Sequence, residues 1–91
     1  MNMTGYQVTR LTNRALAKAG EYPIPPQMVY TYIKKGFIPS HLSAAGQRVV
    51  TRRDAGAFAR RFVFNRLAAR ADALVNDQPV GPFVAPSQVS A

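Results

Sequence analysis

Good helix formers first follow one another over 13–19. Thr12 precedes this segment and supplies a side-chain oxygen that suits the N-terminus of a helix, and Gly20 follows it and suits the C-terminus. The sequence therefore predicts a short helix over 13–19. Residues 1–8 precede it as a short arm, in which Gly5 interrupts any regular pattern.

A second helix is predicted over 27–35, after a proline-rich turn at 21–25. The prolines disfavour helical geometry in the residues before them. Pro26 suits the first helical position, where its missing N–H would be unpaired anyway, and Gly36 suits the position after the last turn. Helical spacing divides the segment into an apolar face and a polar, basic face. The apolar face holds Met28, Val29, Tyr32 and Ile33, and the polar face holds Gln27, Tyr30, Thr31, Lys34 and Lys35.

Two short segments, Phe-Ile-Pro at 37–39 and Gln-Arg-Val-Val at 47–50, follow the second helix. The loop 40–46 between them is rich in small residues and ends on a glycine. This pattern predicts two short strands that pair as a hairpin.

The third predicted helix is longer than one small core requires. Thr51 can cap its N-terminus and Asp54 can reach back to that cap, and apolar residues then recur at helical spacing as far as Val75. A helix with more apolar face than its domain covers usually packs on a second copy of the chain or on another partner. The residues expected at that contact are Phe64, Leu67, Ala71 and Leu74.

These elements divide the chain into an arm at 1–8, one domain at 9–75 and a tail at 76–91. The Pro, Gly and Ser residues of the tail predict flexibility. The fold class is mainly α with a small β-hairpin. A chain of 91 residues buries only about two-thirds of its unfolded surface, so self-association would add to its stability.

The basic residues indicate which kind of partner the chain binds. All 12 Lys and Arg residues lie within 1–71, where Glu21 and Asp54 are the acidic residues. Such a charge attracts polyanions, and nucleic acid and anionic lipid surfaces are the intracellular candidates. The alternative is that the charge serves solubility or a scaffold role.

The chain lacks the residues that several classes of protein function require. Without cysteine and with His41 as its single histidine, the chain offers no disulfide, no thiolate zinc site and no histidine cluster, so neither a metal nor a cofactor is expected. Four carboxylates provide no evident acid–base pair, so an enzyme is not expected either. No apolar segment is long enough to span a bilayer and no secretion signal is evident, which predicts a cytoplasmic protein without a membrane partner.

The order helix, turn, helix, hairpin, helix is typical of winged DNA-binding domains. The residues from Met28 to Pro39, MVYTYIKKGFIP, followed by RVVTRRD from Arg48 to Asp54, resemble the excisionase and MerR-like winged helix-turn-helix families. Those families carry the patterns VYRxIxxGxLP and RxxxxxDL. The resemblance covers about 11–62, and its most specific part is the Gly-Phe-Ile-Pro corner at 36–39. It implies a winged helix-turn-helix. The extended C-terminal helix, predicted from the apolar spacing as far as Val75, departs from the pattern of those families.

The resemblance also implies which residues contact DNA. The second helix would lie in the major groove, where the amide of Gln27 suits the edge of adenine and Lys34 suits phosphate. Arg48 would reach the minor groove or its phosphates from the wing. Arginines at the start of the third helix oppose the helix dipole, which favours a nearby phosphate. The expected DNA-binding residues are Gln27, Tyr30, Thr31, Lys34, Lys35, Arg48, Arg52 and Arg53.

Four further residues are candidates for contact with the DNA backbone: Arg10, Arg14, His41 and Gln47. For each of them, and for the lysines of the second helix, a solvated surface position is the alternative. The arginines at positions 60, 61, 66 and 70 are expected on a solvated face of the long helix and are not assigned to DNA.

The chain has neither the length nor the cysteines of a MerR-type sensing segment, which favours the excisionase end of the resemblance. The expected function is sequence-specific binding and bending of double-stranded DNA by a phage or mobile-element excisionase. Self-association on DNA and contact with an integrase are expected with it, in the nucleoid or host cytoplasm. A small transcriptional regulator of the MerR-like type is one alternative, and a protein-interaction module that docks through the long helix is another.

Overall fold

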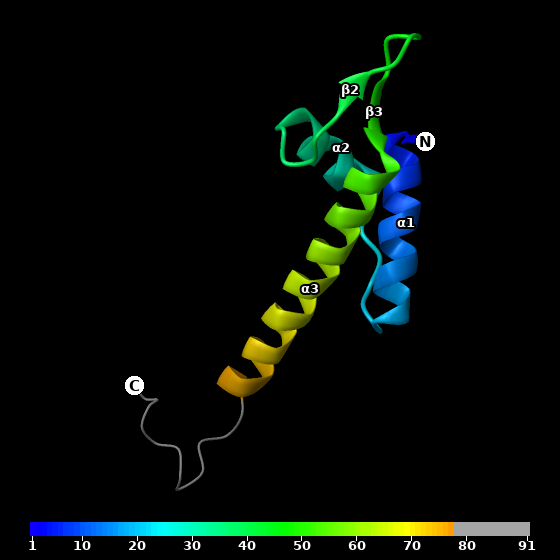
Figure 1. The fold of residues 1–91 in the computed structure, drawn as a ribbon. Coiled ribbons are helices and arrows are strands. Elements are labelled where there is room, and N and C mark those ends of the chain that lie inside the picture. Colours follow the sequence, from blue (N-terminus) through cyan, green and yellow to red (C-terminus); the bar gives the residue numbers. More distant parts are fainter. Residues whose placement is uncertain (78–91) are drawn as a thin grey trace, which may run out of the picture.

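The computed structural model describes residues 1–77, and these form a mainly helical fold with a small antiparallel sheet (Figure 1). Residues 78–91 of the predicted tail lie outside the described residues, whereas 76 and 77 belong to the last helix. The elements are β1 (Asn2–Met3), α1 (Gly5–Lys18), α2 (Pro26–Lys34), β2 (His41–Leu42), β3 (Arg48–Thr51) and α3 (Arg52–Asp77).

The prediction of an irregular N-terminal arm was wrong. Asn2 and Met3 form β1 and pair with Thr51 and Val50 of β3, so that the strand order is β1-β3-β2. Helix α1 begins at Gly5, well before the predicted start at 13. The early start follows from a capping box, in which the Thr4 hydroxyl accepts from the backbone N–H of Gln7 (3.2 Å) while the Gln7 side chain accepts from the Thr4 N–H (2.8 Å).

Thr12 does not cap a helix, contrary to the prediction. It is buried in the middle of α1, where its hydroxyl donates to the carbonyl oxygen of Val8 at 2.9 Å. A threonine satisfied in this way by the preceding turn is tolerated inside a helix.

The predicted turn at 21–25 is confirmed, and two side chains hold it in place. The amide of Asn13 in α1 donates to the carbonyl of Ile24 (3.0 Å) and accepts from its N–H (2.8 Å). Glu21, whose side chain is 9% exposed, forms ion pairs with Arg66 and Arg70 of α3. The turn is therefore fixed to both long helices.

Helix α2 starts at Pro26 as predicted, and Val29 and Ile33 are buried on its apolar face. It ends in a Schellman motif around Gly36, whose φ is +82°. The N–H of Phe37 donates to the carbonyl of Tyr32 at 2.8 Å, and the N–H of Gly36 donates to that of Ile33 at 3.1 Å.

This motif corrects the predicted position of the first hairpin strand. Residues 37–39 continue the helix end instead of pairing, and Ile38 is buried in the core. The strand lies at His41–Leu42, where His41 pairs with Val49 and Leu42 with Arg48. The hairpin itself is confirmed.

The core lies where α1, α2 and the start of α3 meet the sheet. Its largest fully buried side chains include Leu16, Ile38, Val8, Val29 and Val50. Helix α3 starts at Arg52 as predicted, with the Thr51 hydroxyl accepting from the Asp54 N–H at 3.1 Å. It then extends past the end of α1 and away from the core (Figure 1).

Candidate nucleic-acid interface

The polar face of α2 is free of contacts that would cover it. All five predicted residues on it are exposed: Gln27, Tyr30, Thr31, Lys34 and Lys35. They lie on one side because helical positions three and four residues apart are neighbours. The opposite side is held in the core by Val29 and Ile33. Packing therefore fixes which side chains α2 presents outward.

The hairpin brings a further basic side chain to this surface. Tyr30, Ile33 and Lys34 of α2 line a hollow of about 510 Å³ together with Arg48 of β3. The guanidinium of Arg48 also approaches the Ser40 hydroxyl, with Nη1 at 3.5 Å from Oγ. Two cations from separate elements thus face the same space.

A second hollow, of about 260 Å³, adjoins the first through shared residues. Tyr30, Ile33 and Arg48 line both, and Gln47 and the start of α1 at Thr4 and Gly5 complete it. The first N–H groups of a helix carry a partial positive charge. We call the exposed surface formed by Gln27, Tyr30, Thr31, Lys34, Gln47 and Arg48 the α2–hairpin face.

Gly5 positions the tyrosine of this face, a role that the sequence did not indicate. A Cβ at residue 5 would lie 2.5 Å from Cε1 of the Tyr30 ring. The absence of a side chain therefore lets the ring rest on the first turn of α1. No local signal in the sequence pairs residues 5 and 30, because the contact arises from the packing of α1 on α2.

Arg52 and Arg53 do not line the hollows of the α2–hairpin face, although both were predicted to bind the same DNA. With Arg60 they line a separate hollow of about 530 Å³, which is closed on its other side by Leu11 of α1. Arg10 and Arg14 are exposed on α1 as well and line neither hollow of that face. The structure therefore divides the predicted DNA-binding residues between two surfaces.

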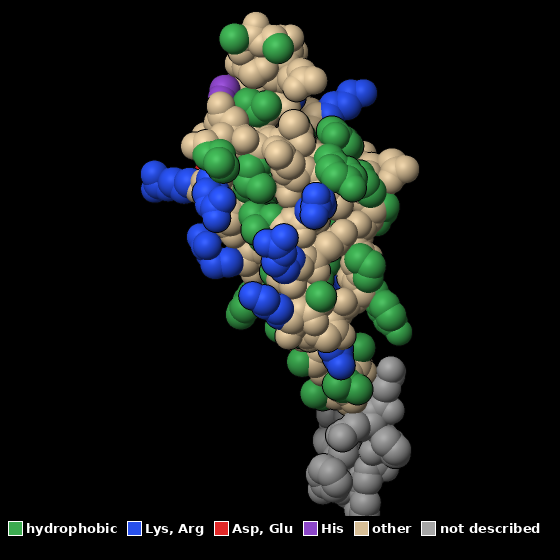
Figure 2. Space-filling view, turned by 90° about the vertical axis from the view of Figure 1, so that its right-hand side faces the viewer, with side chains coloured by type: hydrophobic (Ala, Val, Ile, Leu, Met, Phe, Trp, Pro, Cys, Tyr) green, Lys and Arg blue, Asp and Glu red, His purple; other side chains and the backbone are tan. Residues whose placement is uncertain are grey.

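Figure 2 views the molecule from the side on which α1 lies in Figure 1. Lys and Arg side chains gather over the middle of this side, and no acidic side chain is visible on it.

His41, a predicted candidate for contact with the DNA backbone, is exposed on β2.

Comparison with protein-family models, with curated proteins and with solved structures gave no match. The functional inference therefore depends on the residues of the chain itself. Within residues 1–77 no helix is long and apolar enough to cross a membrane. The same residues contain no group of three or more metal-ligating side chains that could hold an ion.

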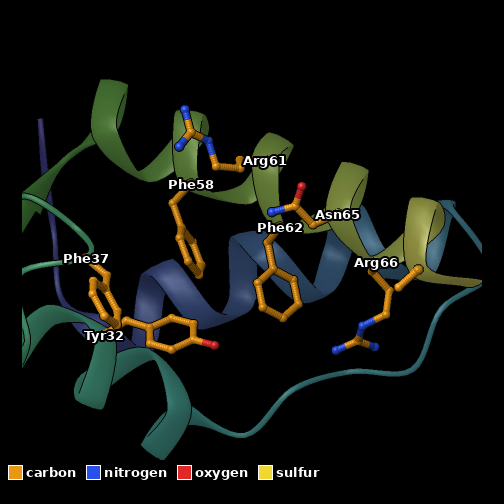
Figure 3. A pocket seen from close by; sticks show the side chains of 8 residues that line it. Tyr32, Phe37, Phe58, Arg61, Phe62, Asn65 and Arg66 are labelled. Atoms are coloured by element: carbon orange, nitrogen blue, oxygen red, sulfur yellow. The ribbon is translucent and has the colours of Figure 1, made fainter.

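A third surface is a groove between α2 and α3 that is lined mainly by aromatic side chains (Figure 3). We call it the aromatic groove. Tyr32 packs edge-on against Phe58, with the ring centroids 5.9 Å apart, and Phe62 lies next along α3. The guanidinium of Arg66 covers the Phe62 ring at 5.1 Å. Phe37 extends this row and is 68% exposed. Arg61 and Arg66 both line this groove, and Arg66, like Arg70, also pairs with Glu21.

The residues predicted for contact between copies remain uncovered in the single chain. Phe64, Leu67 and Leu74 are 71%, 39% and 64% exposed, and Ala71 is exposed as well. They lie on one side of α3, because their spacing of three, four and three residues follows the helical repeat. A partner that covers them would bury apolar surface now in contact with water.

Proposed function

We propose that the protein binds double-stranded DNA through the α2–hairpin face and that its fold is a winged helix-turn-helix. In this arrangement α2 enters the major groove and the β2–β3 hairpin serves as the wing beside it. The observation that carries the proposal is the meeting of Tyr30 and Lys34 from α2 with Arg48 from the hairpin around one hollow. Two cations on separate rigid elements suit a phosphate backbone, because each position is fixed independently.

The residues of the face differ in what they contribute. Gln27 lies in the first turn of α2 and is exposed, so its amide is available to donate to and accept from the edge of adenine. Lys34 and Arg48 act on phosphate, and Thr31 offers a hydroxyl between them and Gln27. Specificity therefore comes from the start of α2, and most of the affinity comes from the cations.

The biological role that we propose is that of an excisionase-like protein of a phage or mobile element. Copies on adjacent sites would contact one another through the exposed α3 residues Phe64, Leu67 and Leu74 and would bend the DNA between them. Repression or activation of a promoter by the same interface is the second outcome within this class. Neither role requires a cofactor or a catalytic group.

A gel-shift titration with a short duplex from the genomic neighbourhood, at two salt concentrations, tests the interface. Lys34→Ala and Arg48→Ala should each weaken the complex and lower the slope of log affinity against log salt by about one unit. Arg61→Ala is the matched control, because Arg61 is an exposed arginine that lines the aromatic groove instead. Failure of the wild-type chain to bind at low salt, or equal effects of all three variants, would contradict the proposal.

The exposed apolar side of α3 supports a second candidate, a protein-interaction module. Phe64 and Leu74 are both more than half exposed, which is unusual for large apolar side chains that lie on one face. An apolar contact responds weakly to salt, whereas phosphate binding weakens steeply. The salt arm of the titration therefore distinguishes the two candidates.

A further inference from the structure

A second strongly basic surface lies where α1 packs on α3. Leu11, Arg53 and Arg60 line one hollow there, and the hollow is open to solvent. Arg14 and Lys18 lie three and seven residues after Leu11, which places them on the side of α1 that faces this hollow. We call this surface the α1–α3 basic face; its cations are Arg10, Arg14, Lys18, Arg52, Arg53 and Arg60, and all are exposed.

These cations are not neutralised by the carboxylates that the structure describes. The ion pairs among described side chains join Glu21 to Arg66 and Arg70, which lie farther along α3. Like charges at helical spacing repel one another and reduce the stability of the fold. A polyanion bound to the face would remove that repulsion.

The α1–α3 basic face is distinct from the α2–hairpin face. The hollow around Leu11 shares no lining residue with the hollows around Tyr30. The cations of the α1–α3 basic face also lie on other elements, α1 and α3, whereas Lys34 and Arg48 lie on α2 and β3. A duplex bound along α2 and the hairpin therefore leaves these cations available to a second ligand.

We propose that the α1–α3 basic face binds the phosphate backbone of a second DNA segment, so that one chain bridges two segments. This inference rests on the proposed function. Arg10 and Lys18, the outermost cations of α1, are eight residues apart. This separation is about 12 Å of helix and matches a length of duplex that carries about seven phosphate charges. The second segment is either a separate duplex or a distant part of the same long one.

A capture assay tests the bridge. One short duplex is fixed to beads, the full chain is added, and retention of a second, fluorescent short duplex is measured at low salt. Arg14→Ala/Arg60→Ala should lower retention of the second duplex by about tenfold or more, because each lost phosphate contact weakens binding. The same variant should bind a single short duplex as the wild type does. Arg61→Ala, the neighbouring exposed arginine outside the face, should leave both signals unchanged.

A single long duplex with a label at each end shows whether the second segment belongs to the same DNA molecule. Its labelled ends approach one another when the duplex loops. Retention of separate duplexes indicates a bridge between molecules, and end-to-end approach that depends on Arg14 and Arg60 indicates a bridge within one. Either result supports the proposal. Unchanged bridging by Arg14→Ala/Arg60→Ala in both arms would overturn it.

Two copies that each bind one duplex and contact one another through α3 would also bridge two duplexes. This arrangement predicts different effects of the variants on retention. In that case Leu67→Asp/Leu74→Asp on the exposed side of α3 would abolish retention while the arginine variant would not, and the proposal would be wrong. It would also be wrong if the arginine variant weakened binding of the first duplex as much as retention of the second. Absence of any wild-type binding to a single duplex would contradict the proposed function itself.

Discussion

The contact between Gly5 and Tyr30 shapes the α2–hairpin face, because glycine has no side chain to overlap the Tyr30 ring. The Tyr30 ring is half exposed and rests on the first turn of α1, at a place where a Cβ would overlap it. Lys34 and Arg48 lie beside the ring on one side, and the start of α1 lies on the other side. The ring therefore occupies space that a side chain at residue 5 would fill. The geometry of the α2–hairpin face therefore depends on a glycine in another element.

Replacement of Gly5 tests this contact. In the wild-type chain, Gly5→Ala should lower the free energy of unfolding by about 1 kcal/mol, because the Tyr30 ring must move. In a Tyr30→Ala background the same change should raise it by up to about 1 kcal/mol, because alanine is the better helix former. Urea denaturation of the four proteins in the cycle measures both effects. An equal effect of Gly5→Ala in the two backgrounds would show that residues 5 and 30 are not coupled.

At the residue scale, local chemistry predicted the outward side of α2 and most of the residues at helix ends, with Thr12 as the exception. The outward residues of α2, the Gly36 end and the Thr51 cap are confirmed. Thr12 was assigned to the wrong role because a threonine oxygen can accept from a first turn or donate to the turn before it. Which of the two occurs depends on the Thr4–Gln7 capping box, eight residues earlier.

The turn between α1 and α2 holds the elements in their relative positions. Glu21 is the carboxylate that joins this turn to α3, and Asn13 joins the same turn to α1. Because α3 extends past the end of α1, these contacts support its middle at a point where little else packs on it (Figure 1). Glu21 is mostly buried whereas Arg70 is more than half exposed, so solvent weakens the ion pair.

Removal of the Glu21 charge should loosen the middle of α3 without unfolding the chain. We expect Glu21→Gln to lower the free energy of unfolding by about 1 kcal/mol and to speed amide hydrogen exchange near Arg66 and Arg70. Asp72→Asn, which removes an exposed carboxylate from the same helix, is the matched control and should change neither. Equal exchange rates in Glu21→Gln and the wild type would show that the ion pairs do not support α3.

At the element scale, α2 and the start of α3 were predicted well, whereas the first half of α1 and the short strands were not. The positions of α2 and of the start of α3 follow from capping residues and apolar spacing. A strand of two residues such as β1 has no periodic signal of its own, and only its pairing with Val50 and Thr51 defines it. Strand β2 begins after residues 37–39 because the Schellman motif takes the N–H groups of Phe37 and Ile38.

The whole molecule distributes its positive charge over two faces instead of one. The sequence shows that the cations precede residue 72, and spacing within a helix shows which of them share a side. The grouping of Arg53 and Arg60 with Leu11, and of Lys34 with Arg48, depends on how α1, α3 and the hairpin pack. No pattern along the chain contains that information, so the sequence assigned these cations to the same DNA, whereas in the structure they line separate hollows.

Binding of duplex DNA on the α2–hairpin face underlies both proposals. An NMR titration of the isotope-labelled full chain with one equivalent of a short duplex tests it directly, because each amide reports on its own surroundings. We expect the largest changes at Gln27, Thr31, Lys34 and Arg48 and unchanged signals at Phe62 and Asn65 in the aromatic groove. Changes centred on that groove, or on Phe64 and Leu74 with α2 unaffected, would contradict it.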